Sequence, residues 1–203
     1  SNGEVRVADI PGKSIKLGDL AVKANPMRGT IKPGTEPGLE ATAYYAPPYG
    51  ATSNGACAAI MEVDPITYNL KFHKFIFVDD CGTVINPMIL DGQLHGGIQM
   101  GIGNSYFEKL AYDENAQLMN GSFIDYLIPR VTDMPPKMEI GHLHTPSPLN
   151  PLGIKGVGES GTIPIPPLYA QAIEDALQIP DLFIDAMPID PSWLYEKIEK
   201  LNK

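Results

Sequence analysis

The chain has 203 residues, of which 43% are hydrophobic, and a formal net charge of −9 at pH 7. This length and composition support a buried core in one large domain or two small ones. The acidic balance argues against a nucleic-acid-binding surface, which needs clustered Lys and Arg. No apolar run approaches the roughly 18 residues of a membrane-spanning helix, so we expect no membrane span.

The two cysteines, Cys57 and Cys81, have neither C-x-x-C spacing nor the number typical of a disulfide framework. The stretch from Ser1 to Glu4 contains no apolar signal-peptide segment. These features indicate a reduced, cytoplasmic compartment. His73 has no second His or Cys at metal-ligand spacing, so the sequence predicts no metal-ligating side chain.

Apolar alternation and turn signals predict several short elements before residue 80. They are a strand near Glu4, a helix carrying Ile15 to Val22, a proline- and glycine-rich loop over 25–38, and strands over 41–45, 55–64 and 70–79, of which residues 66–69 join the last two as a hairpin. The strand over 70–79 is expected to be buried on both faces at its far end.

Asn86 and Pro87 predict a helix start, because Asn caps helices and Pro suits the first helical position. Apolar residues at intervals of four extend this helix to about Lys109. It contains glycines at positions 92, 96, 97, 101 and 103, and each costs about 1 kcal/mol relative to alanine. We therefore expect another group to pack against this backbone or bind it. Gln93, near the positive end of the helix, is either a ligand-binding amide or a solvated surface side chain.

The remaining elements are predicted to be short and separated by prolines. They are strands over 123–128 and 138–145, a helix from Pro166 or Pro167 to about Leu177, and a terminal helix over 191–201. No repeat, low-complexity tract or linker interrupts the chain, so residues 1–203 are expected to form a single unit.

The loop from Lys155 to Ile163 carries three glycines, which let a backbone turn tightly and approach another group. Glu159 lies in its middle. A carboxylate flanked by bare backbone takes its pKa from whatever the loop encloses, which suits a general base. A phosphate-binding loop is the competing interpretation, because a helix N-terminus follows. However, no Gly-Lys-Ser/Thr ends the run, and no Gly-x-Gly-x-x-Gly directly follows an apolar strand.

Several stretches, in this order and spacing, resemble the C-terminal part of the large subunit of the xanthine oxidase and aldehyde oxidoreductase family of molybdenum hydroxylases. They are 36–45, 61–65, 78–82, 85–87, 92–103, 121–126 and 145–161. The resemblance implies an α+β fold, with mixed sheets and packed helices, that forms the C-terminal molybdenum-cofactor-binding domain.

The resemblance also implies roles for individual residues. Glu159 matches the family's general base, which acts toward a metal-bound hydroxyl in the hydroxylation of an aldehyde or N-heterocyclic carbon with water. Cofactor contacts are implied for a second set, which comprises Gln93, Lys155, Gly156, Val157 and Gly158. The cofactor would be molybdenum-molybdopterin, expected in its cytosine dinucleotide form. Met100 stands where family members usually have Gln, so no cofactor role is carried over to it.

Large subunits of this family carry several hundred residues before this region. The resemblance therefore implies activity only with a chain that carries the N-terminal part, together with a 2Fe-2S subunit, an FAD subunit and a small-molecule substrate. Two alternatives are a non-catalytic scaffold subunit of the same fold and a free-standing nucleotide-binding module.

Overall fold

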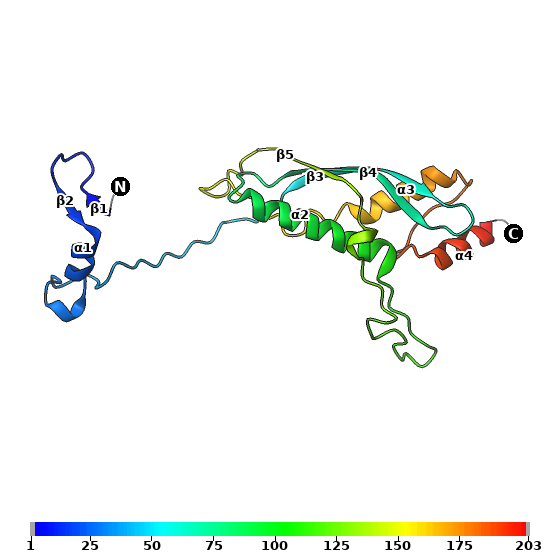
Figure 1. The fold of residues 1–203 in the computed structure, drawn as a ribbon, viewed down its shortest axis with the longest axis horizontal. Coiled ribbons are helices and arrows are strands. Elements are labelled where there is room, and N and C mark those ends of the chain that lie inside the picture. Colours follow the sequence, from blue (N-terminus) through cyan, green and yellow to red (C-terminus); the bar gives the residue numbers. More distant parts are fainter. Residues whose placement is uncertain (1–2, 202–203) are drawn as a thin grey trace. The chain divides into compact units, whose positions relative to one another are not determined.

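A computed structural model describes residues 3–201 of the chain (Figure 1). The chain divides into two compact units, Ser1–Ala46 and Pro47–Lys203. The single unit expected from the sequence stays a prediction. Among the described residues, the helices are all too short or too polar to cross a bilayer.

The first unit contains a small antiparallel pair, β1 (Glu4–Arg6) and β2 (Ser14–Lys16), followed by helix α1 (Leu17–Lys23) and the short 3-10 helix η1 (Pro26–Arg28). Ile15, expected in the helix, pairs with Val5 in the strand ladder instead. The strand predicted over 41–45 is wrong, because the structure assigns none of these residues to a strand. Tyr44 within it is 97% exposed. A strand needs a neighbour to satisfy its backbone, and β propensity alone does not provide one.

The second unit is built on a three-stranded sheet in the order β3, β4, β5. Strands β3 (Asn54–Val63) and β4 (Leu70–Asp80) form the expected antiparallel hairpin, and β5 (Met138–His142) pairs with β4 in parallel. The sheet is therefore mixed, as the predicted α+β class requires. The far end of β4 is buried at both Asp79 and Asp80, which confirms burial on both faces there.

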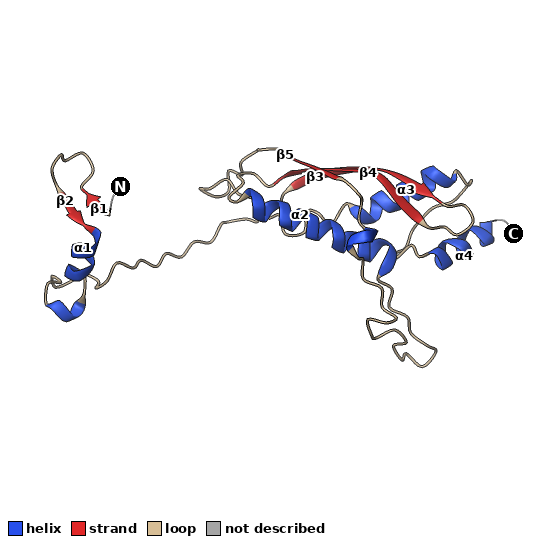
Figure 2. Cartoon of the chain, viewed as in Figure 1, coloured by secondary structure: helices blue, strands red, loops and turns tan. Residues whose placement is uncertain are grey.

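Helices α2 (Pro87–Ile102), α3 (Ile165–Leu177) and α4 (Pro191–Leu201) accompany this sheet (Figure 2). Asn86 caps α2 as predicted, since its side-chain oxygen accepts a hydrogen bond from the backbone N–H of Ile89 at 3.2 Å. The α-helix ends seven residues earlier than expected and continues as a π-helical turn, η2 (Gly103–Phe107). Fully buried side chains from β4, α2 and α3 make the core, among them Phe75, Phe77, Leu94, Ile98, Ile102, Ile165 and Ile173.

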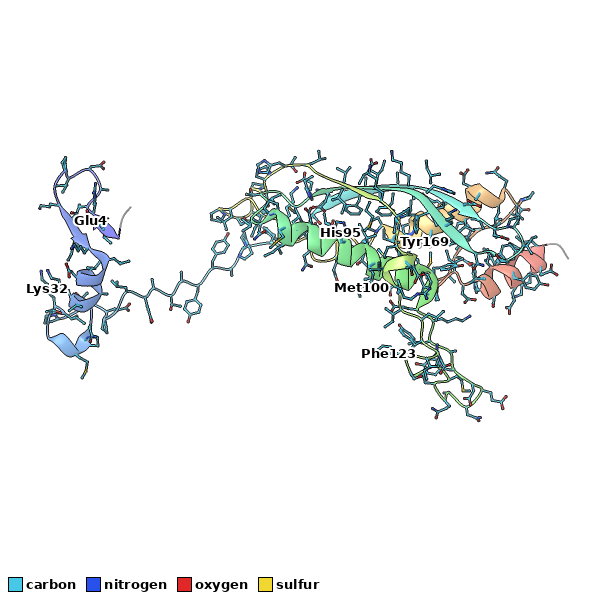
Figure 3. All side chains as sticks on the ribbon, in the orientation of Figure 1. Glu4, Lys32, His95, Met100, Phe123 and Tyr169 are labelled. Atoms are coloured by element: carbon cyan, nitrogen blue, oxygen red, sulfur yellow. The ribbon has the colours of Figure 1, made fainter. Side chains whose placement is uncertain are left out.

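Residues between η2 and β5 leave the core as an irregular excursion that contains only the short 3-10 helix η3 (Val131–Asp133) and an isolated bridge between Tyr112 and Leu118. The strand predicted over 123–128 is wrong. Phe123 and Ile124 are 86% and 89% exposed and lie in a turn (Figure 3). The backbone N–H groups of Asp125 and Tyr126 instead donate to the Ser122 carbonyl, so local turn hydrogen bonds replace those of a strand.

Candidate functional site

The loop from Lys155 to Ile163 is held by main-chain hydrogen bonds to two preceding segments. Lys155 N–H donates to the Cys81 carbonyl at 2.8 Å, just after β4, and Gly156 N–H donates to the Ala51 carbonyl at 2.7 Å. The chain then turns around Glu159, whose carbonyl accepts from Thr162 N–H at 3.0 Å. These bonds place the glutamate at the tip of a compact turn immediately before α3.

The far side of this turn is seated directly on helix α2. A Cβ atom on Gly161 would lie 2.7 Å from the Leu94 carbonyl oxygen and 3.0 Å from the Ile98 nitrogen. Thr162 adds a hydrogen bond from its hydroxyl to the Gly97 carbonyl at 2.8 Å. Backbone therefore meets backbone, and only glycine at position 161 permits this approach.

The costly glycines of α2 separate into packed and open positions. A Cβ on Gly97 would lie 3.1 Å from the Gly161 Cα, and one on Gly101 would lie 2.6 Å from the Ile165 side chain. Gly103 faces the side chain of Glu108. By contrast, a Cβ on Gly92 or Gly96 would meet nothing within 4 Å. Packing inside the chain accounts for Gly97 and Gly101 but leaves Gly92 and Gly96 without a packing reason.

A groove of about 410 Å³ lies between α2 and the turn. Its lining consists of Gly92, Gln93, Gly96, Gly97, Met100, Gly158, Glu159, Thr162 and Ile163. The structure thus brings Gln93, Gly158 and Glu159, separated by more than sixty positions in the sequence, to one groove. Met100, labelled in Figure 3, and Ile163 are 57% and 70% exposed, so the groove also presents apolar surface.

The other predicted cofactor contacts lie outside this groove. Lys155 and Val157 line a second hollow of about 250 Å³, which Gln93 also borders. Gly156 forms an isolated parallel bridge with Thr52. Gln93 therefore stands between the two hollows, and the segment 155–157 reaches only the second.

The Lys155 side chain is turned inward, which the sequence did not indicate. It is only 10% exposed, and its Nζ lies 3.3 Å from Asp80 Oδ1 and donates to Thr145 Oγ1 at 2.8 Å. The Thr145 hydroxyl also donates to Asp80. This hydrogen bond, aided by the backbone N–H groups of Gly82 and Thr145 and by Lys155, holds the Asp80 pKa well below its usual range despite burial. Lys155 is thus a structural cation, because its ammonium group is held by Asp80 and Thr145.

His73 pairs with an acidic side chain on the surface of the sheet. Its Nε2 lies 2.7 Å from Glu62 Oε2 across the exposed face of β3 and β4. Residues 3–201 contain no group of three His, Cys, Asp or Glu side chains able to hold a metal ion.

Asp79 is buried directly behind the glutamate turn, where Ser160 donates its hydroxyl to Asp79 Oδ1. The adjacent carboxylates of Asp79 and Asp80, at the end of an apolar strand, were the signal that sequence reasoning passed over.

Comparison with known proteins shows which family and which relatives the chain resembles. Residues 1–135 match the profile of a family described as the molybdopterin cofactor-binding domain. The matched region includes Gln93 and α2 but ends before Glu159. Only the alignments with individual relatives can therefore cover the glutamate turn.

Those relatives extend over both parts of the groove. The chain is 42% identical over 170 residues to the nicotine 6-hydroxylase large subunit of Paenarthrobacter nicotinovorans, which is 84% of this chain and 20% of that protein. It is 37% identical over 197 residues to the carbon monoxide dehydrogenase large chain of Afipia carboxidovorans, which is 97% of this chain and 24% of that protein.

A solved structure shows the same fold. Quinoline 2-oxidoreductase from Pseudomonas putida 86 matches with a TM-score of 0.82 and 42% identity over 98% of this chain and 25% of that chain. The chain therefore spans about a fifth to a quarter of the length of the relatives that it matches.

Proposed function

The chain belongs to the family of molybdopterin cofactor-binding domains, and we propose that it forms the C-terminal, cofactor-binding part of the large subunit of a molybdenum hydroxylase. The proposed reaction is the hydroxylation of an aldehyde or N-heterocyclic carbon with water as the oxygen source. The observation that carries the proposal is the groove in which a glycine-bearing helix faces the exposed carboxylate of Glu159.

The open glycines of α2 fit a flat, bulky cofactor. Gly92 and Gly96 lie one helical turn apart, so both present bare backbone on one side of the helix. A Cβ at either position would fill the space where a pterin could lie. The Gln93 amide, at the junction of the two hollows, can both donate and accept hydrogen bonds. When bound, the molybdenum cofactor would supply the redox centre and the Lewis acidity of the reaction.

Glu159 is suited to accept a proton at the edge of this groove. Its side chain is exposed, and it makes no hydrogen bond or ion pair with the described part of the chain. The turn fixes its backbone, whereas its carboxylate is left free for a substrate or a water molecule. A general base must lie within hydrogen-bond reach of the proton it removes, and residues outside this chain would complete that geometry.

The substrate class rests on the named activities of the relatives. Nicotine and quinoline are N-heterocycles, and both enzymes named for them are 42% identical to this chain. The carbon monoxide dehydrogenase is 37% identical. This difference favours an organic carbon as the site of hydroxylation.

The proposal includes the partners of such a subunit. A molybdopterin cytosine dinucleotide is favoured by the likeness to carbon monoxide dehydrogenase. The electrons would pass to 2Fe-2S clusters and FAD on partner subunits, and a chain carrying the N-terminal part would cover the groove. Cys57 and Cys81 are free thiols, which favours a reducing compartment such as the cytoplasm.

The test is the substitution Glu159→Gln in the assembled enzyme. It keeps the side-chain volume and removes the base, so turnover should fall by about a hundredfold or more while the molybdenum content, measured by mass spectrometry, stays at the wild-type level. Normal turnover of this variant would contradict the assignment of Glu159. Wild-type assemblies that contain molybdenum but oxidise neither aldehydes nor N-heterocycles would instead support the non-catalytic scaffold.

A further inference from the structure

The last two residues of β4 are carboxylates, and the period of the strand sends them in opposite directions. Asp79 lies on the face that carries Phe75 and Phe77, because alternate residues of a strand share a face. These two phenylalanines are completely buried in the core. Asp79 thus extends the core-facing row of β4 toward the place where the glutamate turn meets α2.

Burying the carboxylate of Asp79 at that position costs folding free energy. Asp79 is 1% exposed, and its Oδ2 atom has no hydrogen-bond partner among the described residues. Its Oδ1 atom accepts a hydrogen bond from the Ser160 hydroxyl. Burying a carboxylate costs free energy unless donors compensate for the lost water. Among the described residues, the Ser160 hydroxyl is the one side-chain donor to this carboxylate. The burial of Asp79 is therefore compensated through Ser160.

Ser160 is also the residue that directly follows Glu159. Its backbone N–H donates to the Val157 carbonyl at 3.1 Å, which closes the turn from inside. Its side chain ties the same turn to β4 through Asp79. Rotation of the turn about its ends would move Glu159 and would break this bond.

The pair is one of several attachments around the glutamate. Asp80 holds Lys155 at the start of the loop, and the backbone of Gly161 rests on α2 immediately after Ser160. Asp80 and the α2 contact hold the two ends of the segment. Among the described residues, the hydrogen bond between Asp79 and Ser160 is the side-chain contact that ties the residue following Glu159 to the sheet.

We propose that Asp79 is a positioning residue that acts through Ser160 to hold Glu159 facing the α2 groove. This inference rests on the proposed function, in which Glu159 is the general base. A base displaced by about 1 Å can lose about a hundredfold in rate, although binding is retained. The pair therefore contributes to turnover without touching substrate or cofactor.

The experiment compares Ser160→Ala, Ser160→Thr and Asp79→Asn in the assembled enzyme. Ser160→Ala should lower kcat by about tenfold to a hundredfold with KM within about twofold of wild type, because the base moves but the groove remains. Ser160→Thr keeps the hydroxyl and should restore most of kcat. Asp79→Asn keeps the volume of the side chain and an oxygen that can accept from Ser160, but it removes the charge that strengthens the bond, so kcat should fall in the same direction by a smaller factor.

Two readouts besides activity separate positioning from general damage. Amide hydrogen exchange of residues 156–162 should be faster in Ser160→Ala, and the molybdenum content should match that of wild type. Ser105→Ala is the matched control, since Ser105 is fully buried and donates its hydroxyl at 2.6 Å to the Gly101 carbonyl of α2 rather than to a group that binds Ser160. It should alter neither kcat nor exchange in the turn.

The outcomes distinguish this inference from the proposed function. If Glu159→Gln is inactive but Ser160→Ala and Asp79→Asn match the Ser105→Ala control, the positioning role is wrong and the function stands. If Glu159→Gln remains active, the proposed function fails first. Loss of molybdenum from Ser160→Ala, or failure of threonine to restore kcat, would also overturn the inference, because a structural or cofactor-holding role would then explain the loss.

Discussion

Gly161 lies so close to Leu94 that a Cβ atom on the glycine would stand 2.7 Å from the Leu94 carbonyl oxygen. Real Cβ atoms essentially never make such a contact with backbone, so the turn and helix α2 fit together only because residue 161 has no side chain. This contact, together with the hydrogen bond from the Thr162 hydroxyl to the Gly97 carbonyl, holds the turn that carries Glu159 against the helix that bears Gln93.

The first prediction concerns this contact. Gly161→Ala should push the turn away from α2 and lower the free energy of unfolding by about 1 to 3 kcal/mol, the usual cost of overpacking. Thermal unfolding of the assembled protein measures this change. Gly158→Ala is the control, because a Cβ there would meet nothing within 4 Å and should leave the unfolding temperature unchanged. Equal stability of the two variants would show that the turn yields freely.

The second prediction separates the open glycines of α2 from the packed ones. Gly96→Ala should not destabilise the fold, and the better helix propensity of alanine favours a gain of about 0.5 to 1 kcal/mol. The added methyl group would occupy the groove, so the molybdenum and pterin content of the purified enzyme should fall. Gly101→Ala should show the opposite pattern, with lower stability from its contact with Ile165. Full cofactor content in Gly96→Ala would place the cofactor elsewhere.

The third prediction concerns pH. The folded-state pKa of Asp80 lies below its unfolded value, so this carboxylate stabilises the fold above the unfolded pKa of about 3.9. The stabilisation is lost as the pH falls below that value toward the folded pKa. Asp80→Asn should therefore lower the unfolding temperature at neutral pH, and the difference from wild type should shrink below about pH 4. A difference that is constant across an acid titration would contradict this linkage.

Much of the local structure could be predicted from the sequence. The hairpin of β3 and β4, the Asn86 cap of α2 and helix α4 follow from signals within a few residues of each other, namely alternation, turn residues and capping. The structure confirms each of them. The family resemblance rested on motifs of the same local kind, and the family match confirms it.

The two failed strands show where local signals end. The segments 41–45 and 123–128 have suitable strand compositions, yet the structure assigns neither to a strand. Strand formation requires hydrogen-bond partners in another segment of the chain. Composition records only the propensity, and so it overestimates strands.

By itself, the sequence determined which residue types stand in the glutamate turn and which family the motifs resemble. It also showed that α2 carries several glycines, each of which lowers the stability of a helix. Only the tertiary structure decided that Gly97 and Gly101 are packed while Gly92 and Gly96 are open. It also decided that Lys155 turns inward to Asp80 and that Asp79 lies behind Ser160. The physical reason is that these properties belong to contacts between segments far apart in the chain, and a contact across sixty or more positions leaves no periodic trace in either segment.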